Sequence, residues 1–487
     1  MNRRSRITAA ILAIAAASAC SHRAAPAPVP STPAALVAAP SAPAWSSSEL
    51  TALQAQLRDA LGESALATSG IAVVDGNGRP LFGRRERTPM APASTFKVLV
   101  AAAALQVLGP DYRFSTTFES VDDPSDGTIR GDVYVVGNGD PLLTRDDLRG
   151  GAGAIARAGV HAITGAVVAD ATLFSGTEIN PAWDPDDLQY GYASGTSALS
   201  LDQGTVEFHL VPLAVGAPAR IRVLPPSGMV RVRGAVLTSY STLLAIKRDP
   251  ARNDFTFEGR VAAGAEQSFW RPVIGLPLYA AGVARSMLRD RGVAVAGGIR
   301  DGVAPVAPYV LWRHRSPALR EIVREMMLES NNHFAEQLLR AVGATRGSGT
   351  EATGALVERA ILARGGVPQE GLRIVDGSGL APSDRVTAIT LAMLLARTAV
   401  EPGGATFVGS LARAGIEGTV RWRHLTDARG RVRAKSGHIA HVNALTGYVQ
   451  TRRHGRVAFA IIVNDRRADD GPVERGIDRA LDVLARS

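Results

Sequence analysis

The hydrophobic pattern of the first hundred residues predicts alternating helices and strands. A helix-like stretch runs from Leu50 to Leu61, and an apolar strand pattern follows from Gly70 to Asp75. The strand ends at the turn Gly76-Asn77-Gly78, after which Leu81 and Phe82 predict a returning strand. The stretch Val98 to Leu108 is apolar on nearly every side, which predicts a buried helix.

From about residue 113 to residue 300 the pattern becomes a series of short β-type runs broken by glycine and proline. The clearest runs are 131–136, 166–169, 207–212, 221–224 and 256–261. No repeat of fixed period is present. The middle of the chain is therefore expected to be a β-rich unit.

Helical spacing returns behind Ser316-Pro317, a cap followed by a first-turn proline. The helix should end near Glu329 and give way to a second helix that contains Phe334. Two strand patterns, 444–450 and 457–463, predict a hairpin, and a last helix is expected over 473–485. The apolar residues of the first helix are Leu319, Ile322, Val323, Met326 and Met327.

The first 19 residues have the pattern of an export signal, with a basic start, an apolar run and the small-residue ending Ala17-Ser18-Ala19. Cys20, the single cysteine, follows directly. Two outcomes stay open here: lipidation of Cys20, which would tether the protein to a membrane, and plain cleavage near the same bond. Residues 20–47 are nearly all Ala, Pro, Ser and Val, which predicts a spacer with no packed core.

Composition and charge narrow the function classes. The chain has 487 residues, 46% of them hydrophobic, which is enough for two or three packed domains. The formal net charge is +9, but the arginines are scattered and no nucleic-acid-binding motif is present. Nucleic acid is therefore not an expected partner, whereas a scattered positive charge favours residence near anionic lipid or wall polymer.

Lysine is rare in this chain, since only Lys97, Lys247 and Lys435 occur among 54 basic residues. Arginine cannot be deprotonated in a protein, whereas a buried lysine amine can act as a base. Lys247 is expected in an exposed loop beside Arg248 and Asp249. The other two lysines lie in short polar motifs and are candidates for chemistry.

Lys97 follows Ser94 by three residues, so the two side chains share a face if the segment is helical. The apolar helix that follows predicts a buried amine with a lowered pKa, and a serine needs such a neighbour to become a nucleophile. On its own, Ser-x-x-Lys is also the pattern of a helix cap followed by a surface lysine.

Two further motifs carry complementary groups. Ser330 and Asn332 lie at the expected junction of two helices, where a hydroxyl and a carboxamide could pass protons and hold a substrate amide, although a helix cap has the same pattern. Lys435 and Ser436 could bind a substrate carboxylate, and Gly437 would let a peptide lie close to a strand edge.

Ser-x-x-Lys, Ser-x-Asn and Lys-Ser/Thr-Gly in this order resemble the three motifs of penicillin-binding proteins and serine β-lactamases. The long separation of the first two motifs resembles the low-molecular-mass class C penicillin-binding proteins, which are D-alanyl-D-alanine carboxypeptidases and endopeptidases. The segments 131–141, 376–380 and 445–449 are also similar to that family. The likeness runs from about residue 48 to the end of the chain.

The resemblance implies an α/β (α+β) transpeptidase-like domain, a sheet covered by helices, built from 48–112 and 305–487 and interrupted by a β-rich insertion over 113–304. It implies Ser94 as nucleophile, Lys97 as general base, Ser330 as proton relay and Asn332 as amide holder. Its partners would be peptidoglycan stem peptides and, as covalent inhibitors, β-lactams, and the chemistry needs no metal or organic cofactor. Export to the periplasm or cell envelope is expected.

The resemblance also assigns the substrate-binding residues. Lys435, Ser436 and Gly437 would line the carboxylate end, and the backbone N–H groups of Ser94 and His438 would hold the oxyanion. Asp187 would lie near the amine of the stem peptide. Three departures from the family occur: Ser436 replaces a threonine, His438 stands where Thr or Ser is common, and Ala381-Pro382 occupies a place where some relatives have a substrate-contacting arginine.

Other functions remain open at this point. A β-lactamase or esterase could use the same motifs, and a non-enzymatic sensor of wall peptides or β-lactams could use the site as a receptor. A metal site at His438 and His441 is not expected, because on an extended strand the two side chains would point to opposite faces. The segment 376–379 lacks the spacing of a nucleophile elbow, which predicts a turn.

Overall fold

The structure is a computed structural model that describes residues 43–62, 66–124, 126–264, 266–464 and 470–487. The expected signal peptide 1–19, Cys20 and the spacer up to residue 42 lie outside the described residues. Among the helices it describes, none is long and apolar enough to cross a membrane.

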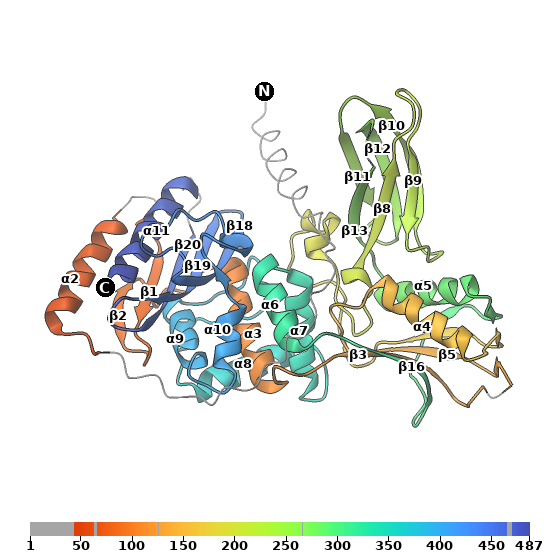
Figure 1. The fold of residues 1–487 in the computed structure, drawn as a ribbon, viewed down its shortest axis with the longest axis horizontal. Helices are drawn as coiled ribbons and strands as arrows, with labels where there is room; N and C mark the ends of the chain where they lie inside the picture. Colours follow the sequence, from red (N-terminus) through yellow and green to blue (C-terminus); the bar gives the residue numbers. More distant parts are fainter. Residues whose placement is uncertain (1–42, 63–65, 125, 265, 465–469) are drawn as a thin grey trace.

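One half of the molecule is built on a six-stranded antiparallel sheet (Figure 1). Its order is β17-β18-β19-β20-β1-β2, so β1 near the start of the chain pairs with β20 near its end, and β2 extends the sheet beyond β1. The strands are β1 (Gly70–Val74), β2 (Pro80–Arg84), β17 (Ala412–Arg413), β18 (Val432–Ile439), β19 (Val442–Gln450) and β20 (Arg456–Asn464).

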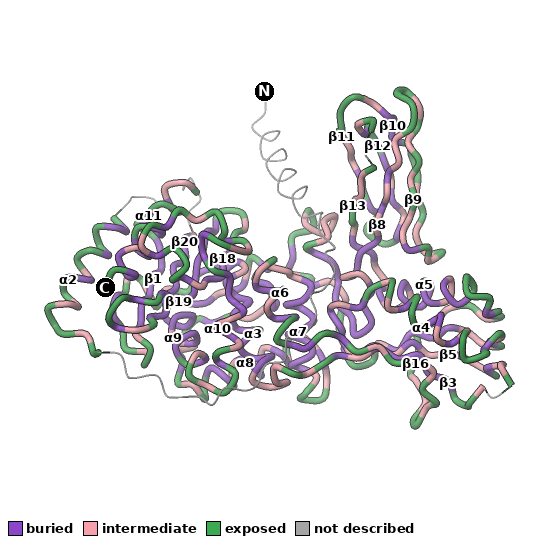
Figure 2. The backbone as a smooth tube through the Cα atoms, viewed as in Figure 1, coloured by how far each residue is buried: buried purple, intermediate pink, exposed green. Residues whose placement is uncertain are grey.

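Helices cover both faces of this sheet, and the strands are accordingly apolar on both sides. Ile71 and Val73 face one cluster with helices α2 (Ser47–Ala60) and α11 (Asp470–Arg486). Ala72 and Val74 face the other, which contains most of the remaining helices. Those helices are α3 (Lys97–Val107), α6 (Leu319–Glu329), α7 (Asn332–Ala344), α8 (Glu351–Arg364), α9 (Ala388–Thr398) and α10 (Gly404–Ser410). Figure 2 shows buried backbone running through the centre of this half.

The second half is centred on a five-stranded sheet of order β15-β7-β5-β3-β16. Two helices, α4 (Arg145–Arg157) and α5 (Leu276–Asp290), share a buried cluster with it. The strands are β3 (Ser115–Ser120), β5 (Val133–Gly137), β7 (Val167–Asp170), β15 (Ile299–Asp301) and β16 (Tyr309–Arg315).

Three smaller three-stranded sheets complete this half, and two of them project from it in Figure 1. The projecting sheets have the orders β10-β12-β11 and β13-β8-β9, and the third is β14-β6-β4. Their strands are β4 (Thr128–Ile129), β6 (Ala162–Ile163), β8 (Thr205–Val211), β9 (Arg220–Leu224), β10 (Arg231–Ser239), β11 (Leu243–Arg248), β12 (Asp254–Ala262), β13 (Gln267–Pro272) and β14 (Ala294–Val295).

The α/β fold and most predicted elements are confirmed within a few residues, but four details differ. The middle region also contains the helices α4 and α5. The main sheet of this region also includes β16, which ends at Arg315 and pairs with β3. The paired strands of the middle region therefore extend beyond residue 304, the expected end of the insertion. Lys247 lies in strand β11 rather than in a loop. His441 lies beyond the end of β18 with a φ of 65°, so it is in a turn and not on an extended strand.

Candidate active site

Ser94 lies in the 3₁₀ turn η3 (Ala93–Phe96), which runs directly into α3. The residue before it, Ala93, has a φ of 46°, a conformation that costs energy for any residue with a Cβ. Gly379 packs against this point so closely that a Cβ on it would collide with the carbonyl oxygen of Ala93. The surrounding structure therefore fixes the backbone that carries Ser94.

Lys97 is fully buried and its amine makes three short hydrogen bonds. It donates to Ser94 Oγ over 2.8 Å, to Asn332 Oδ1 over 2.6 Å and to the Ser378 carbonyl oxygen over 2.9 Å. Two of these acceptors are carbonyl groups that cannot give up a proton. A neutral amine that keeps both of them has its lone pair directed at Ser94 Oγ.

Burial lowers the pKa of Lys97 to about 7, while the nearby carboxylates of Asp376 and Glu336 act in the opposite direction. The pKa of Lys435 is lowered well below its usual value, first by burial and then by Lys97. Lys97 is thus suited to accept a proton near neutral pH.

Ser330 and Asn332 lie at the junction of α6 and α7, as the sequence predicts. Ser330 ends α6 with a left-handed φ of 59°, and Asn331 caps α7 by accepting from Phe334 N. This break turns the Ser330 hydroxyl toward Lys435 Nζ, which donates to it over 2.8 Å. Asn332 connects two parts of the site, because its Nδ2 donates to the Tyr192 carbonyl oxygen over 2.9 Å.

Lys435, Ser436 and Gly437 lie within β18, which begins at Val432. A Cβ on Gly437 would come within 2.7 Å of Pro92 O and 3.0 Å of Ser94 N, so only glycine lets this strand approach the nucleophile. Ser436 Oγ lies 2.7 Å from Thr419 Oγ1.

The remaining two predicted residues lie at the edge of the site. The His438 side chain is 61% exposed, and its Nδ1 lies 3.9 Å from Asp470 Oδ1. Asp187 accepts from the Tyr192 hydroxyl over 2.7 Å, and burial raises the pKa of its carboxyl. Because Tyr192 also accepts from Asn332, Asp187 is joined to the site through one residue. The described residues contain no cluster of His, Cys, Asp and Glu that could hold a metal ion.

Two buried acidic side chains hold the turn that presents the Ser378 carbonyl to Lys97. The sequence singled out the segment 376–380 but gave neither acid a role. Glu336 accepts from the backbone N–H groups of Gly377 and Ser378, the latter over 2.8 Å. Asp376 accepts from Gly379 N over 2.6 Å and from Ala381 N over 2.7 Å. The sequence feature that could have indicated this role is the spacing of Glu336, an acid that lies four residues after Asn332 and therefore on the same face of the helix.

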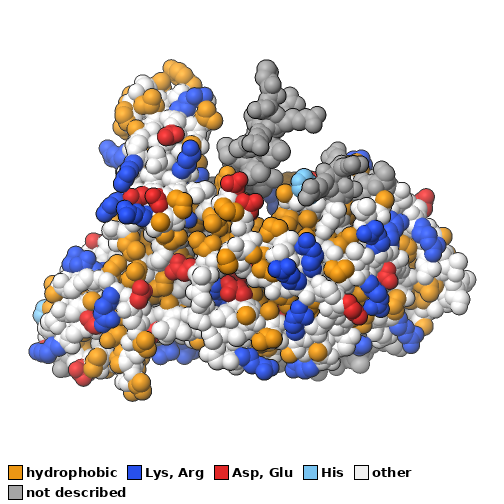
Figure 3. Space-filling view, turned by 180° about the vertical axis from the view of Figure 1, so that it is seen from behind, with side chains coloured by type: hydrophobic (Ala, Val, Ile, Leu, Met, Phe, Trp, Pro, Cys, Tyr) orange, Lys and Arg blue, Asp and Glu red, His pale blue; other side chains and the backbone are white. Residues whose placement is uncertain are grey.

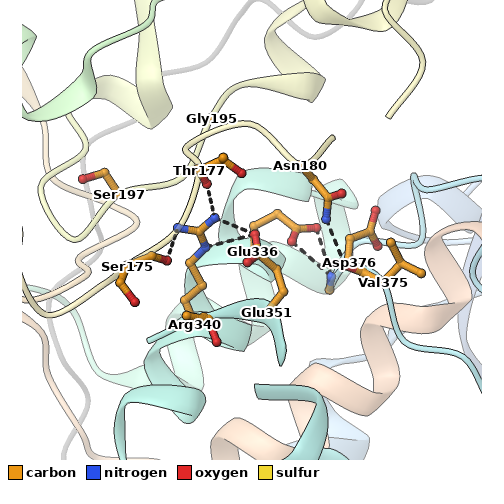
Figure 4. Close-up of polar contacts among 12 residues, drawn as sticks. Ser175, Thr177, Asn180, Gly195, Ser197, Glu336, Arg340, Glu351, Val375 and Asp376 are labelled. Atoms are coloured by element: carbon orange, nitrogen blue, oxygen red, sulfur yellow. Dashed lines mark hydrogen bonds and ion pairs between the residues drawn. The ribbon is translucent and has the colours of Figure 1, made fainter. Parts of the chain in front are cut away.

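The same helix holds a loop of the middle region against the turn, as Figure 4 shows. Arg340, which is 2% exposed, pairs with Glu351 over 2.5 Å and donates to the Thr177 carbonyl oxygen. Asn180 donates to the Val375 carbonyl oxygen over 2.9 Å. Loop 175–180 and the turn are therefore fixed to one another by buried polar contacts.

A comparison with protein-family models gives a match to the D-Ala-D-Ala carboxypeptidase 3 (S13) family over residues 53–487. The chain belongs to this family. The sequence resemblance to class C penicillin-binding proteins is thereby confirmed, and the family match covers the three motifs and the region between them.

Individual relatives agree with the family match. A D-alanyl-D-alanine carboxypeptidase of Actinomadura sp. is 33% identical over 92% of this chain and 87% of its own. D-alanyl-D-alanine carboxypeptidase DacB of Haemophilus influenzae is 27% identical over 79% of this chain and 82% of its own. The crystal structure of penicillin-binding protein 4 from H. influenzae matches with a TM-score of 0.78 at 24% identity, over 89% of this chain and 99% of that one. This likeness identifies the fold as that of penicillin-binding protein 4.

Proposed function

We propose that the protein is a serine D-alanyl-D-alanine carboxypeptidase and endopeptidase that acts on peptidoglycan stem peptides through an acyl-enzyme on Ser94. The observation that carries this proposal is the buried amine of Lys97, 2.8 Å from Ser94 Oγ and held by two carbonyl oxygens. The substrate class is taken from family membership and from the named activity of the Actinomadura relative.

In the first step, Lys97 accepts the proton of Ser94 while Oγ attacks the carbonyl carbon of the penultimate D-alanine. The new C–O bond places negative charge on the carbonyl oxygen. The backbone N–H groups of Ser94 and His438 are assigned to bind that oxygen. The close approach of Gly437 to Ser94 N supports this assignment, since it brings β18 next to the nucleophile.

In the second step the C–N bond breaks, and the leaving amine takes a proton that Lys97 supplies by way of the Ser330 hydroxyl. The contact of Ser330 with Lys435 supports this role, because the lysine fixes the direction of the hydroxyl. Water then attacks the acyl carbonyl carbon while Lys97 accepts one of its protons. The ester bond to Ser94 Oγ breaks, Lys97 returns the proton to Oγ, and the shortened peptide leaves. No step requires a metal or a cofactor.

The substrate carboxylate is assigned to Lys435 and Ser436, with His438 beside them on the strand. Lys435 is buried, and a substrate carboxylate there would favour its charged form. Asp187 is assigned to the amine of the stem peptide because it is linked to Asn332 through Tyr192. The departures at His438 and Ala381-Pro382 bear on which substrates are preferred.

The substrate lies outside the cytoplasm, so the protein acts there. We further propose that a lipid on Cys20 tethers the protein to a membrane. This predicts that the protein purified from the cell envelope begins at a lipid-modified Cys20. Mass spectrometry of the N-terminal peptide distinguishes this from simple cleavage.

The test is intact-mass analysis after brief exposure to benzylpenicillin, with the wild type beside Ser94→Ala. We expect a stable adduct of one drug mass on the wild type and none on the variant. Ser175→Ala is the control, because this hydroxyl bonds to that of Ser348, which is not one of the assigned site residues. Intact drug without an adduct on the wild type contradicts the proposal, and rapid drug hydrolysis without an adduct favours a β-lactamase.

A further inference from the structure

An exposed aromatic and basic surface includes Thr419, whose hydroxyl contacts Ser436 at the carboxylate end of the site. We define it by Ile416, Thr419, Arg421 and Trp422, and call it the 416–422 surface. Trp422 is 74% exposed and Ile416 is 44% exposed. The Arg421 guanidinium lies 4.8 Å from the centroid of the Trp422 ring. Tryptophan is seldom so exposed in a folded protein, and a group of this kind at a site is typical of a binding surface.

The 416–422 surface is firmly attached to the catalytic strand. Its turn η7 (Gly418–Val420) is anchored by Val420, which is buried and whose carbonyl oxygen accepts from Gly415 N over 2.9 Å. Arg421 donates to the Gly418 carbonyl oxygen over 3.0 Å. The Thr419 hydroxyl lies 2.7 Å from that of Ser436 on β18. A surface held in this way loses little conformational entropy when a ligand binds.

Its position fixes which part of a substrate it can reach, and this step rests on the proposed function. The scissile carbonyl lies at Ser94 and Gly437, and the leaving residue lies toward Lys435 and Ser436. Thr419 touches Ser436, so it lies at the far end of the leaving residue. Anything attached beyond the leaving residue therefore passes over the 416–422 surface.

We propose that the 416–422 surface binds the leaving-group side of a cross-linked substrate and selects for endopeptidase cleavage. A free D-alanine ends at its carboxylate and reaches no further than Ser436. The leaving group of a cross-link is the amine of a second stem peptide, which continues across Thr419 onto Trp422.

The chemistry of the 416–422 surface fits an anionic peptide. The Trp422 ring offers apolar area to aliphatic side chains, and Arg421 offers a cation to carboxylates. The segment from 413 to 433 contains six arginines and two acids, although Arg413 is paired with Glu417 and the largely buried Arg423 with Asp478. The arginines are Arg413, Arg421, Arg423, Arg429, Arg431 and Arg433, and the acids are Glu417 and Asp427.

A second exposed apolar group provides the matched control. Tyr240 is 87% exposed and Leu243 is 60% exposed, at the outer end of β10 and β11. Figure 3 shows hydrophobic side chains at that outer end, on the part that projects from the rest of the molecule. Tyr240→Ala therefore removes an exposed aromatic ring away from the site.

The experiment compares two substrates with purified full-length wild type, Trp422→Ala, Arg421→Ala and Tyr240→Ala. One substrate is a monomeric muropeptide with a D-alanyl-D-alanine end, and the other is a D-alanyl cross-linked dimer without such ends. We expect kcat/KM for the dimer to fall about tenfold in Trp422→Ala and several-fold in Arg421→Ala. Both variants should keep kcat/KM for the monomer within about twofold, and Tyr240→Ala should change neither value.

Equal losses on both substrates, or no loss on the dimer, overturn the inference. A wild type that cleaves the monomer but not the dimer also overturns it, while leaving carboxypeptidase function intact. A wild type that cleaves neither substrate and forms no adduct at Ser94 contradicts the proposed function itself. Melting temperatures of the variants identify a loss that comes from misfolding.

Discussion

The amine of Lys97 donates to the backbone carbonyl oxygen of Ser378 over 2.9 Å, across 281 positions of sequence. This contact gives the turn at 376–379 a role in the site. Together with Asn332 Oδ1, the Ser378 carbonyl occupies two donors of the amine and leaves the third direction for Ser94. A buried base is useful only if its lone pair has a fixed direction, and these two carbonyl groups fix it.

The pH dependence of acylation tests this arrangement. Because the pKa of Lys97 is lowered to about 7, the neutral amine forms as pH rises through that value. The second-order rate of acylation by benzylpenicillin should rise from acid pH and level off above about pH 8, with roughly a tenfold lower rate near pH 6. Stopped-flow or quenched mass measurements between pH 5.5 and 9 check it.

Lys97→Arg is the matched control for the pH profile, since arginine keeps the charge but does not deprotonate. We expect no measurable acylation of this variant at any pH in the range. A flat profile for the wild type would rule out Lys97 as the titrating base.

The sequence predicted the fold and the three motifs because these depend on local pattern and order. The strand pattern at 444–450 and the helix break at Ser330 are both local properties, and both are confirmed. The contacts of Ser378, Glu336 and Thr419 could not be predicted in this way. They depend on which loops meet in space, and the responsible atoms at Ser378 are backbone atoms that every residue possesses.

Glu336→Gln tests whether the carboxylate under this turn positions the base. Glutamine keeps one acceptor oxygen for the N–H groups of Gly377 and Ser378. It removes a carboxyl whose own pKa burial raises to about 8, and whose charged form raises the pKa of Lys97. We expect the plateau rate of acylation to fall about tenfold and the midpoint of its pH profile to move to lower pH. The same rate measurements across pH provide both values.

Glu358→Gln is the control, because it neutralises another buried acid of the same half and shows what the loss of any such acid does to acylation. Glu358 is buried on α8, and neither of its carboxyl oxygens has a hydrogen-bond partner in the described structure. Burial raises the pKa of the Glu358 carboxyl well above its usual value, and Glu358 is not among the groups that shift the pKa of Lys97. The pH midpoint of the Glu358→Gln variant should therefore match that of the wild type. Equal shifts in both variants would mean that Glu336 acts only through the general stability of the fold.

Gly437→Ala tests the close approach of β18 to the nucleophile. A Cβ there would lie 2.7 Å from Pro92 O and 2.8 Å from Thr95 N, both backbone atoms that cannot rotate away. The strand must move outward, which displaces His438 N from the carbonyl oxygen of the substrate. Since removal of one oxyanion donor costs about 10² to 10³ in rate, we expect acylation to fall by at least about a hundredfold.

Gly409→Ala is the matched control, because a Cβ at that position meets nothing within 4 Å. It should acylate at the wild-type rate. The melting temperatures of the two variants measure how much the displacement of β18 destabilises the fold. Near-normal acylation of Gly437→Ala would contradict the assigned position of the oxyanion.

Arg340→Met tests the buried link between the middle region and the catalytic half. The substitution leaves Glu351 without its partner and the Thr177 carbonyl oxygen without its donor. Breaking a buried ion pair on one side costs about 3–5 kcal/mol, so we expect a clearly lower melting temperature. Hydrogen exchange should also increase over loop 175–180, which the arginine holds against the turn at 375–379.

The double variant Arg340→Met with Glu351→Leu removes both charges and should recover part of the lost stability, because no unpaired carboxylate remains. If the double variant were as unstable as Arg340→Met alone, the cost would come from the lost backbone contacts of loop 175–180 and not from the ion pair.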